Sequence, residues 1–270
     1  MEFQEYIKNR KIIIGMIHIP ALPGTPENKL TPKEIIQKCI EEAKIYQKHG
    51  LKVLMIENMH DIPYTKRIGP EIITLMTLIG AEIKKLGLYC GIQILAAANK
   101  EAIAAAHASG MDFIRAEGFV YAHVADEGYI ESCAGDLLRY RKSINAEKIK
   151  IFTDIKKKHS SHAITSDVNI AETAHAAEFF LSDGVIVTGE STGKEPNLEE
   201  VKAVKKSVKG PVLIGSGITN ENLKNFFDYS DIFIVGSYIK KDGYWKNELD
   251  ETRISKLMKE FERLMGETKK

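Results

Sequence analysis

The stretch Ile12-Ile13-Ile14-Gly15-Met16-Ile17-His18 is a short apolar run that ends in an ionisable side chain. Similar runs follow along the chain, and each is separated from the next by a stretch with helical periodicity. The runs cover residues 12–17, 53–56, 88–94, 113–114, 149–152, 185–187, 212–214 and 232–235. Regular alternation of strands and helices over about 250 residues predicts a closed eight-stranded parallel barrel, the (β/α)8 or TIM barrel.

The segments between the runs begin and end as helices do. Thr31-Pro32-Lys33-Glu34 supplies an N-cap hydroxyl, a proline at the first helical position and a glutamate that can close a capping box. The further predicted helices cover residues 70–86, 100–108, 134–144, 168–181, 198–206, 221–227 and 249–265. Because no Pro/Gly/Ser-rich linker interrupts the pattern, we predict one barrel domain spanning residues 1–270.

Composition excludes several classes of protein. The 38 Lys and Arg balance 37 Asp and Glu, so the net charge of +1 provides no field for nucleic acid. The basic runs at 156–158, 205–206 and 240–241 are typical of solvated surfaces. No apolar stretch approaches the roughly 20 residues of a membrane span. The three scattered cysteines and the polar, mixed-charge N-terminus predict a cytoplasmic protein without membrane insertion, and a homo-oligomer is left open.

Ionisable and polar side chains stand at or just after the ends of the predicted strands. The carboxyl ends of parallel strands meet at one mouth of a barrel, so we expect these side chains to share a pocket. Carboxylates that converge there repel one another, which raises at least one pKa into a range useful for proton transfer. The predicted catalytic residues are Asp154, Glu57, His18, Glu117 and His159, and the predicted substrate-binding residues are Asn58, Arg115, Asp126, Lys156, Thr188 and Thr192.

Asp154 is the first candidate for the general acid or base, because it follows an apolar strand where a charge has no structural advantage. Glu57 and His18 then position the reacting end of the substrate. We therefore expect Asp154→Asn to slow catalysis and to spare folding. Two other interpretations stay open: a divalent metal ion held by carboxylate and imidazole groups, or an internal ion-pair network with the neighbouring arginine and lysines. No other cofactor is indicated.

Two glycine turns follow the last two predicted strands and predict an anion site. Phosphate commonly binds between these two loops of a TIM barrel, on backbone N–H groups and at a helix N-terminus. The segment 188–194 contains a Gly-Lys pair but lacks the P-loop spacing, so it is interpreted as a substrate loop. The predicted phosphate-binding residues are Gly215, Ser216, Gly217, Gly236 and Ser237.

Several of these segments together resemble the BtpA family of barrel proteins. They occur in order from residue 11 to about 244, at every predicted strand end. They are Gly15-Met16-Ile17-His18-Ile19-Pro20-Ala21-Leu22-Pro23-Gly24-Thr25-Pro26, Ile56-Glu57-Asn58-Met59-His60-Asp61-Ile62-Pro63-Tyr64, Phe113-Ile114-Arg115, Asp126-Glu127-Gly128-Tyr129-Ile130, Asp154-Ile155-Lys156-Lys157-Lys158-His159, Thr188-Gly189, Gly215-Ser216-Gly217-Ile218-Thr219 and Ile234-Val235-Gly236-Ser237. The resemblance implies a TIM barrel of the phosphate-binding type.

The chain departs from the family pattern in two places. The third strand contains Gln93 where the family commonly has asparagine, and the Arg-Asn-Asp type segment that usually follows is missing. Glu117 stands after the fourth strand where asparagine is common. These changes argue against transferring a substrate from other members of the family.

Two classes of function agree with this sequence. The first is an enzyme that acts on a small phosphorylated metabolite, such as a sugar phosphate or a nucleotide-derived compound, by acid–base chemistry. An isomerase, a lyase, an aldolase or a glycosyl-bond enzyme would fit. No lysine directly follows the sixth strand, which argues against a Schiff-base aldolase of the usual barrel layout. The second is an assembly or stability factor for a protein complex, as the family name implies through photosystem I biogenesis. Titratable groups opposite a phosphate cradle favour the enzyme.

Overall fold

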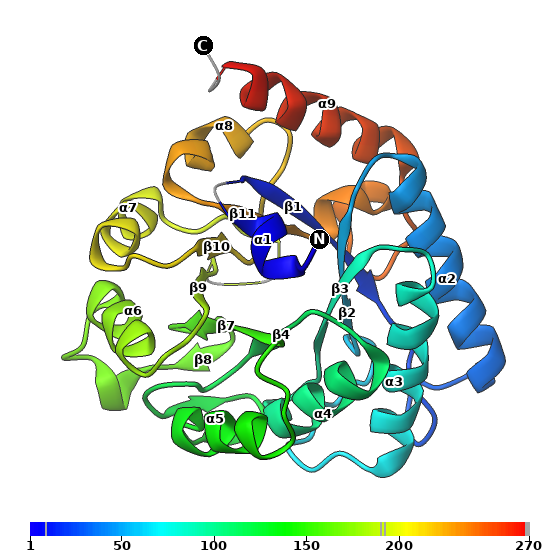
Figure 1. Ribbon diagram of the computed structural model, residues 1–270, viewed down its shortest axis with the longest axis horizontal. Helices are drawn as coiled ribbons and strands as arrows, with labels where there is room; N and C mark the ends of the chain where they lie inside the picture. The colour runs from blue at the N-terminus through cyan, green and yellow to red at the C-terminus, as the bar shows by residue number, and fades with distance from the viewer. Residues whose placement is uncertain (9, 190, 192, 268–270) are drawn as a thin grey trace.

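The computed structural model describes residues 1–8, 10–189, 191 and 193–267. Within these residues, eight parallel strands close into a barrel in the order β1-β11-β10-β9-β7-β4-β3-β2, and helices surround it (Figure 1). The predicted TIM barrel is confirmed. The barrel strands are β1 (Ile12–His18), β2 (Val53–Glu57), β3 (Tyr89–Gln93), β4 (Phe113–Ala116), β7 (Lys150–Ile155), β9 (Gly184–Val187), β10 (Val212–Ile214) and β11 (Ile232–Val235).

The outer helices lie close to the predicted segments. They are α2 (Pro32–Lys48), α3 (Pro70–Lys84), α4 (Asn99–Ser109), α5 (Ala134–Ser143), α6 (Ile170–Phe179), α7 (Leu198–Ser207), α8 (Leu223–Phe226) and α9 (Glu251–Glu267). The predicted capping box at the start of α2 is present, because Thr31 and Glu34 bond each other's backbone N–H groups. The predicted helix 221–227 is shorter than expected, since α8 passes into a 3-10 turn, Phe227–Tyr229.

Alternating residues of each strand face opposite sides of the barrel wall. Ile12, Ile14 and Met16 belong to the apolar cluster inside the barrel, together with Phe113 and Phe152. Their neighbours in the strands pack outward against the helices. Gly91 leaves the interior space that Phe113 fills, since a Cβ there would lie 2.1 Å from the Phe113 ring. This period of two determines which residues reach the mouth.

A short N-terminal helix, α1 (Phe3–Ile7), closes the barrel at the end opposite the mouth (Figure 1). Phe3 stacks on Phe113 with ring centroids 5.1 Å apart, and its ring lies 6.4 Å from that of Phe152. In the sequence this segment is recognisable only as a polar terminus of mixed charge. One open end of the barrel is therefore filled by apolar packing, and the other end is left for a pocket.

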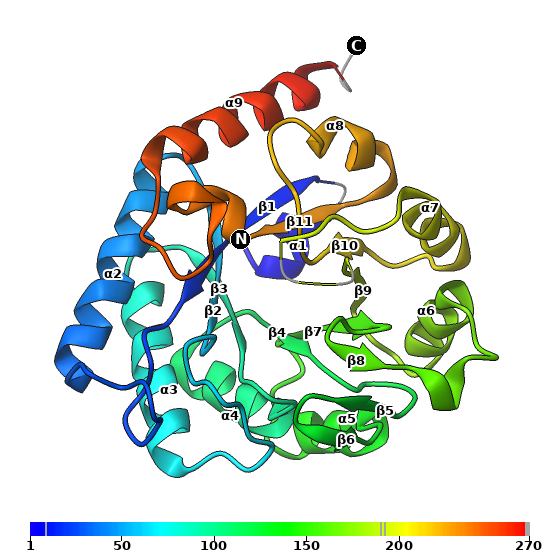
Figure 2. The same ribbon diagram turned by 180° about the vertical axis from the view of Figure 1, so that it is seen from behind.

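Three further short strands form a small antiparallel sheet beside the mouth (Figure 2). They are β5 (His123–Ala125), β6 (Gly128–Ile130) and β8 (Ser160–Ser161), in the order β6-β5-β8. The sheet was not predicted, because its strands have only two or three residues. Pairing of β5 with β8 joins the loop after β4 to the loop after β7.

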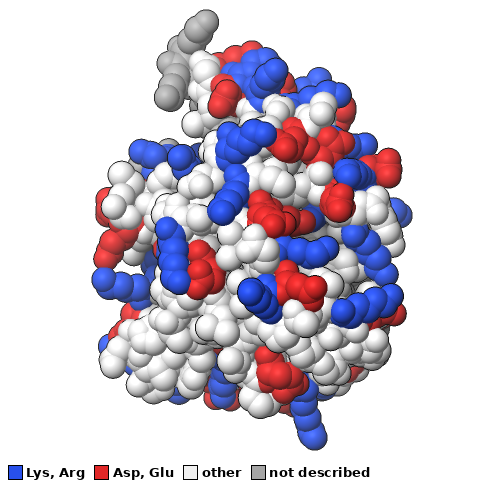
Figure 3. All heavy atoms as spheres, turned by 90° about the vertical axis from the view of Figure 1, so that its right-hand side faces the viewer, with Lys and Arg blue, Asp and Glu red and all other residues white. Residues whose placement is uncertain are grey.

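The surface agrees with a net charge near zero. Lysine and arginine alternate with aspartate and glutamate over the face that contains α2 and α9 (Figure 3). No helix within the described residues is long and apolar enough to cross a membrane.

Candidate functional site

Every second residue of a barrel strand faces the interior. In most strands, the inward-facing residue that follows the last apolar one lies at the mouth of the barrel. After Ile14 and Met16 the next inward residue is His18, and after Val53 and Met55 it is Glu57. The same step leads to the polar and glycine residues of the other strands. These are Gln93, Arg115, Glu117, Asp154, Thr188, Gly215 and Gly236.

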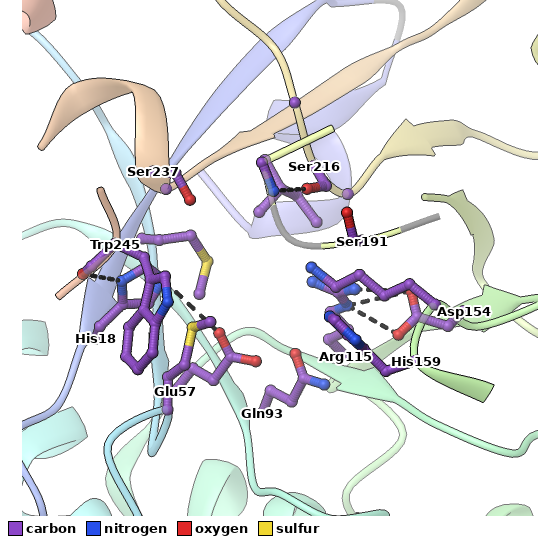
Figure 4. Close-up of a pocket in the computed structure, with 18 of the residues that line it drawn as sticks. His18, Glu57, Gln93, Arg115, Asp154, His159, Ser191, Ser216, Ser237 and Trp245 are labelled. Atoms are coloured by element: carbon purple, nitrogen blue, oxygen red, sulfur yellow. Dashed lines mark hydrogen bonds and ion pairs between the residues drawn. The ribbon is translucent and has the colours of Figure 1, made fainter. Parts of the chain in front are cut away.

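Most of these residues line a pocket of about 590 Å³ at the mouth. Ser191, Ser216 and Ser237 lie on one side, and Glu57, Gln93, Arg115 and Asp154 lie on the other (Figure 4). The pocket therefore brings together the predicted phosphate-binding turns and the predicted catalytic groups. The predicted residues that line it are His18, Glu57, Arg115, Glu117, Asp126, Asp154, His159, Gly215, Ser216, Gly217, Gly236 and Ser237.

Asp154 is held by Arg115 in a buried ion pair. The guanidinium Nε lies 3.2 Å and 3.1 Å from the two carboxylate oxygens, and Nη2 donates to Oδ1 at 2.9 Å. Strand β7 extends past the predicted end at residue 152, so Asp154 lies inside the strand. With both of its oxygens engaged, Asp154 is placed to orient Arg115. Its predicted role as the general acid or base is untested, and this geometry favours another group.

Glu117 is likewise engaged by several donors. Its Oε2 accepts a hydrogen bond from the Ala97 N–H at 2.7 Å, and its Oε1 accepts one from Gln93 at 3.2 Å. Lys157 lies 3.1 Å from the same Oε1. The two departures from the family pattern, Gln93 and Glu117, are therefore partners of each other. Glu117 forms part of the pocket floor with its charge already compensated.

Glu57 and His18 are less fully engaged and face each other. His18 Nδ1 lies 3.2 Å from the Trp245 carbonyl oxygen, and its Nε2 lies 3.9 Å from Glu57 Oε2 (Figure 4). Burial lowers the pKa of His18 to about 3, with a further contribution from Lys240, so the ring is neutral. Burial also raises the pKa of Glu57, although Arg115 and Lys158 oppose the shift. The contact is therefore not an ion pair at neutral pH.

The glycine turns expose backbone donors to the pocket. The N–H groups of Ser216, Gly217 and Ile218 donate no hydrogen bond to another described residue, and neither do those of Gly236 and Ser237. A concave group of unpaired N–H donors favours an anion. Gly217 has φ +73°, and a Cβ there would lie 2.2 Å from the backbone of Lys194 and Glu195. The loop 193–195 thus packs directly on this cradle.

The two glycine turns, which together form the anion cradle (Gly215–Gly217 and Gly236–Ser237), lie directly beside the catalytic candidates. A Cβ on Gly215 would lie 3.3 Å from Arg115 Nη2, and a Cβ on Gly236 would lie 3.1 Å from the His18 ring. The Ser216 hydroxyl accepts a hydrogen bond from the Gly193 N–H at 3.0 Å. An anion in the cradle would therefore place the remainder of a small molecule beside Arg115, His18 and Glu57.

Three of the predicted substrate-binding residues that the structure describes do not line this pocket. Asn58 is buried and bonds Asp61 and the backbone of Leu95. Lys156 turns away and donates to the Thr165 carbonyl at 2.9 Å. Thr188 is buried beneath Gly215, and Thr192 lies outside the described residues.

Other lining residues were not predicted from the sequence. Lys157 and Lys158 enter the pocket, and Lys240 is buried in an ion pair with Glu42 at 2.6 Å. The interpretation of these basic runs as solvated surface was therefore wrong for these positions. Trp245, the single tryptophan of the chain, also lines the pocket. A lone tryptophan in a polar segment after the eighth strand was the available signal.

The divalent metal ion, which the sequence left open as an alternative, is not supported by a cluster of donors among the described residues. Within the described residues, no three His, Cys, Asp or Glu side chains are arranged to hold a metal ion. The arrangement instead combines a neutral imidazole, a desolvated carboxyl group, a paired guanidinium and a lysine amine around one cavity. Such a set can bind an anionic molecule and move protons on it.

Two of the solved structures that are similar in fold have names that contain phosphorylated compounds. A geranylgeranylglyceryl phosphate synthase from Thermoplasma acidophilum, in complex with sn-glycerol-1-phosphate, superposes with a TM-score of 0.61 at 16% identity, covering 96% of this chain and 98% of that one. An orotidine 5'-monophosphate decarboxylase from Methanocaldococcus jannaschii gives 0.58 at 16% identity, covering 93% and 98%. At this identity the likeness shows the fold alone.

Sequence relatives match nearly the whole chain. An uncharacterised protein of Caenorhabditis elegans, named as mitochondrial, is 55% identical over 258 residues and covers 93% of each chain. The photosystem I biogenesis protein BtpA of Synechocystis is 30% identical over 258 residues, covering 94% of this chain and 89% of its own. The model of the BtpA family matches residues 9–263. The chain therefore belongs to the BtpA family.

Proposed function

We propose that this protein is an enzyme that acts on a small phosphorylated metabolite by acid–base chemistry at the barrel mouth. One observation carries the proposal: an anion cradle and a group of titratable side chains face each other across one pocket of about 590 Å³. Ligand pockets of several hundred cubic ångströms suit small metabolites. A scaffold protein would gain nothing from this arrangement.

The phosphate group would occupy the cradle between Gly215–Gly217 and Gly236–Ser237. Unpaired N–H groups supply donors there, and the Ser237 hydroxyl points into the same space (Figure 4). Arg253 of α9 lines this side of the pocket as a cation, with its Nη1 donating to the Tyr238 carbonyl at 3.2 Å. Donors and positive charge on one side of a cavity favour a dianionic group.

Glu57 is the proposed general acid or base. Its raised pKa brings it nearer to neutral pH than an exposed glutamate, which favours proton exchange with a substrate. A neutral His18 with its Nδ1 proton held by the Trp245 carbonyl presents the Nε2 lone pair toward Glu57. His18 would therefore accept a hydrogen bond on the Glu57 side. Arg115, oriented by Asp154, would stabilise negative charge that develops on the substrate.

The test is a panel of phosphorylated metabolites measured against the purified protein. Binding is followed by the melting temperature and by the fluorescence of Trp245, which lines the pocket. Each compound that binds is then tested for turnover. Binding of phosphorylated members with loss of affinity for their dephosphorylated counterparts supports the proposal. Equal binding of both forms contradicts the phosphate site.

The second candidate is an assembly or stability factor for a protein complex. The observation that favours it is the name of the Synechocystis relative, a photosystem I biogenesis protein at 30% identity. The assembly or stability factor becomes the better interpretation if no phosphorylated metabolite binds and a protein partner is recovered in stoichiometric amount. The cytoplasmic location stays a prediction, and the name of the worm relative assigns that protein to the mitochondrion.

A further inference from the structure

Three consecutive lysines after β7 have three different environments. Lys156 donates to the Thr165 carbonyl outside the mouth pocket. Lys157 forms ion pairs with Glu117 at 3.1 Å and with Glu127 at 3.8 Å. Lys158 lines the mouth pocket, and its amine has no hydrogen-bond or ion-pair partner among the described residues. The environment of the amine, and not the residue type, therefore distinguishes Lys158 from its neighbours.

The backbone holds Lys158 in this position. Lys156 and His159, on either side of the pair 157–158, have φ of +49° and +54°, in a region that residues other than glycine rarely adopt. The Lys157 carbonyl accepts a hydrogen bond from His162 Nε2 at 2.9 Å, and the segment that follows pairs with β5. Such backbone strain persists only where the surrounding contacts impose it. The loop therefore directs the second and third lysines inward and leaves the first outside.

The Lys158 amine is also easier to deprotonate than an ordinary lysine. Burial, together with the nearby Arg115 guanidinium, lowers its pKa to about 8, although Glu57 and Asp154 oppose the shift. At pH 7.5 an amine with this pKa is unprotonated about a quarter of the time, against about one part in a thousand for an exposed lysine. By contrast, Glu117 and Glu127 outweigh the effect of burial at Lys157 and raise its pKa.

We propose that Lys158 is a covalent nucleophile and that the substrate is a phosphorylated aldehyde or ketone. This inference rests on the proposed function, because the phosphate cradle would hold the substrate while its carbonyl group meets the amine. In the usual barrel aldolases the lysine follows the sixth strand, whereas Lys158 follows β7, the fifth strand of the barrel. Lysine amines form Schiff bases with carbonyl substrates when their pKa is lowered.

The reaction at Lys158 balances without a further reagent. The lone pair of Nζ attacks the carbonyl carbon, the carbonyl π electrons move to the oxygen, and that oxygen takes up a proton to form a carbinolamine. The nitrogen loses a proton to the Glu57 carboxylate. Glu57 then donates this proton to the departing hydroxyl group, which leaves as water, and the nitrogen lone pair forms the C=N bond of a protonated imine.

The experiment uses pyridoxal 5'-phosphate as a phosphorylated aldehyde probe and sodium borohydride to reduce the imine to a stable secondary amine. The full chain is treated with one equivalent of probe at pH 7.5, and the site of labelling is found by fragmentation of the peptide in a mass spectrometer. We expect at least about tenfold more label at Lys158 than at Lys157. The labelling rate at Lys158 should rise with pH and level off above about 8.

Lys158→Arg retains the charge and should remove this label, with Lys156→Arg as the matched control that retains it. Excess inorganic phosphate should slow labelling of Lys158. If Lys158 is labelled but phosphate does not slow the labelling, the result supports Lys158 as the nucleophile and contradicts the phosphate site in the cradle. If phosphate binds, as seen by Trp245 fluorescence, and Lys158 is labelled no faster than Lys157, the inference is overturned while the phosphate site stands.

Discussion

His18 Nε2 and Glu57 Oε2 lie 3.9 Å apart at the ends of two neighbouring strands of the barrel. The two residues are direct partners in the register of β1 and β2, so the sheet itself brings them together. The pKa of His18 is lowered to about 3 and that of Glu57 is raised, in both cases mainly by burial. The pair therefore carries less charge than two exposed side chains would, and is suited to exchange a proton with a bound substrate.

Glu57→Gln tests the proposed acid or base directly. The change keeps the size of the side chain and removes its ability to ionise. Once a substrate is found, we expect turnover to fall by about 100- to 10,000-fold, because this is the usual contribution of a general acid or base. The melting temperature and the affinity for inorganic phosphate should change little. Wild-type turnover by this variant would exclude Glu57 from the mechanism.

Asp154→Asn is expected to act first on stability, contrary to the expectation from the sequence. Asp154 has both oxygens on Arg115 inside the protein, and removal of one partner of a buried ion pair costs about 3–5 kcal/mol. Urea denaturation measures this loss of unfolding free energy. Glu147→Gln, which breaks an exposed pair with Lys142, is the control and should leave stability nearly unchanged. Equal stability of the Asp154 variant and wild type would show that the ion pair is dispensable.

Ser237→Asp should abolish the binding of phosphate to the cradle. A carboxylate at this position repels a dianion, whereas Ser237→Asn introduces a side chain of the same size without the charge. We expect the aspartate variant to bind inorganic phosphate at least about tenfold more weakly than the asparagine variant, as a like-charge contact costs more than about 1.4 kcal/mol. The fluorescence of Trp245 reports the titration. Equal affinities would place the anion elsewhere.

Gly217 is a less suitable position than Ser237 for testing the cradle. Gly217→Val would put a side chain 2.2 Å from the backbone of Lys194 and Glu195, at a φ of +73°. The loop would have to move, and a loss of binding would then have two explanations. Ser237 has an intermediate exposure and already carries a side chain, so its replacement disturbs the backbone less.

His18 should make stability dependent on pH in the acid range. Its pKa is about 3 in the folded protein and about 6.5 when exposed, so below pH 6.5 the unfolded chain takes up a proton that the folded protein excludes. Stability therefore falls as the pH is lowered from 6.5 toward 3. Between pH 8 and pH 5 this contribution amounts to about 2 kcal/mol.

His18→Asn keeps a donor for the Trp245 carbonyl and removes the titration. The difference in unfolding free energy between pH 8 and pH 5 should therefore be about 2 kcal/mol smaller in this variant than in wild type. His175→Asn, at an exposed position on α6, should retain the wild-type dependence. An unchanged pH dependence in the His18 variant would mean that the histidine takes up its proton as readily in the folded protein as in the unfolded chain.

The sequence by itself determined the barrel and the end at which its polar residues gather. Few other folds are compatible with apolar runs separated by capped helices, because each parallel strand must be covered on both faces. The period of two along β1 and β2 also places His18 and Glu57 inward. These features depend on local patterns, and a local pattern involves only residues that are close together in the sequence.

Only the tertiary structure decided which partner each polar side chain finds. Asp154 finds Arg115 on a neighbouring strand, 39 positions earlier, and His18 finds the Trp245 carbonyl 227 positions later. Lys156, Lys157 and Lys158 have the same side chain, yet the turns of one loop send them to a carbonyl, to carboxylates and into the pocket. Such outcomes depend on strand register, loop conformation and burial together, and the energy of a charge changes with each of them.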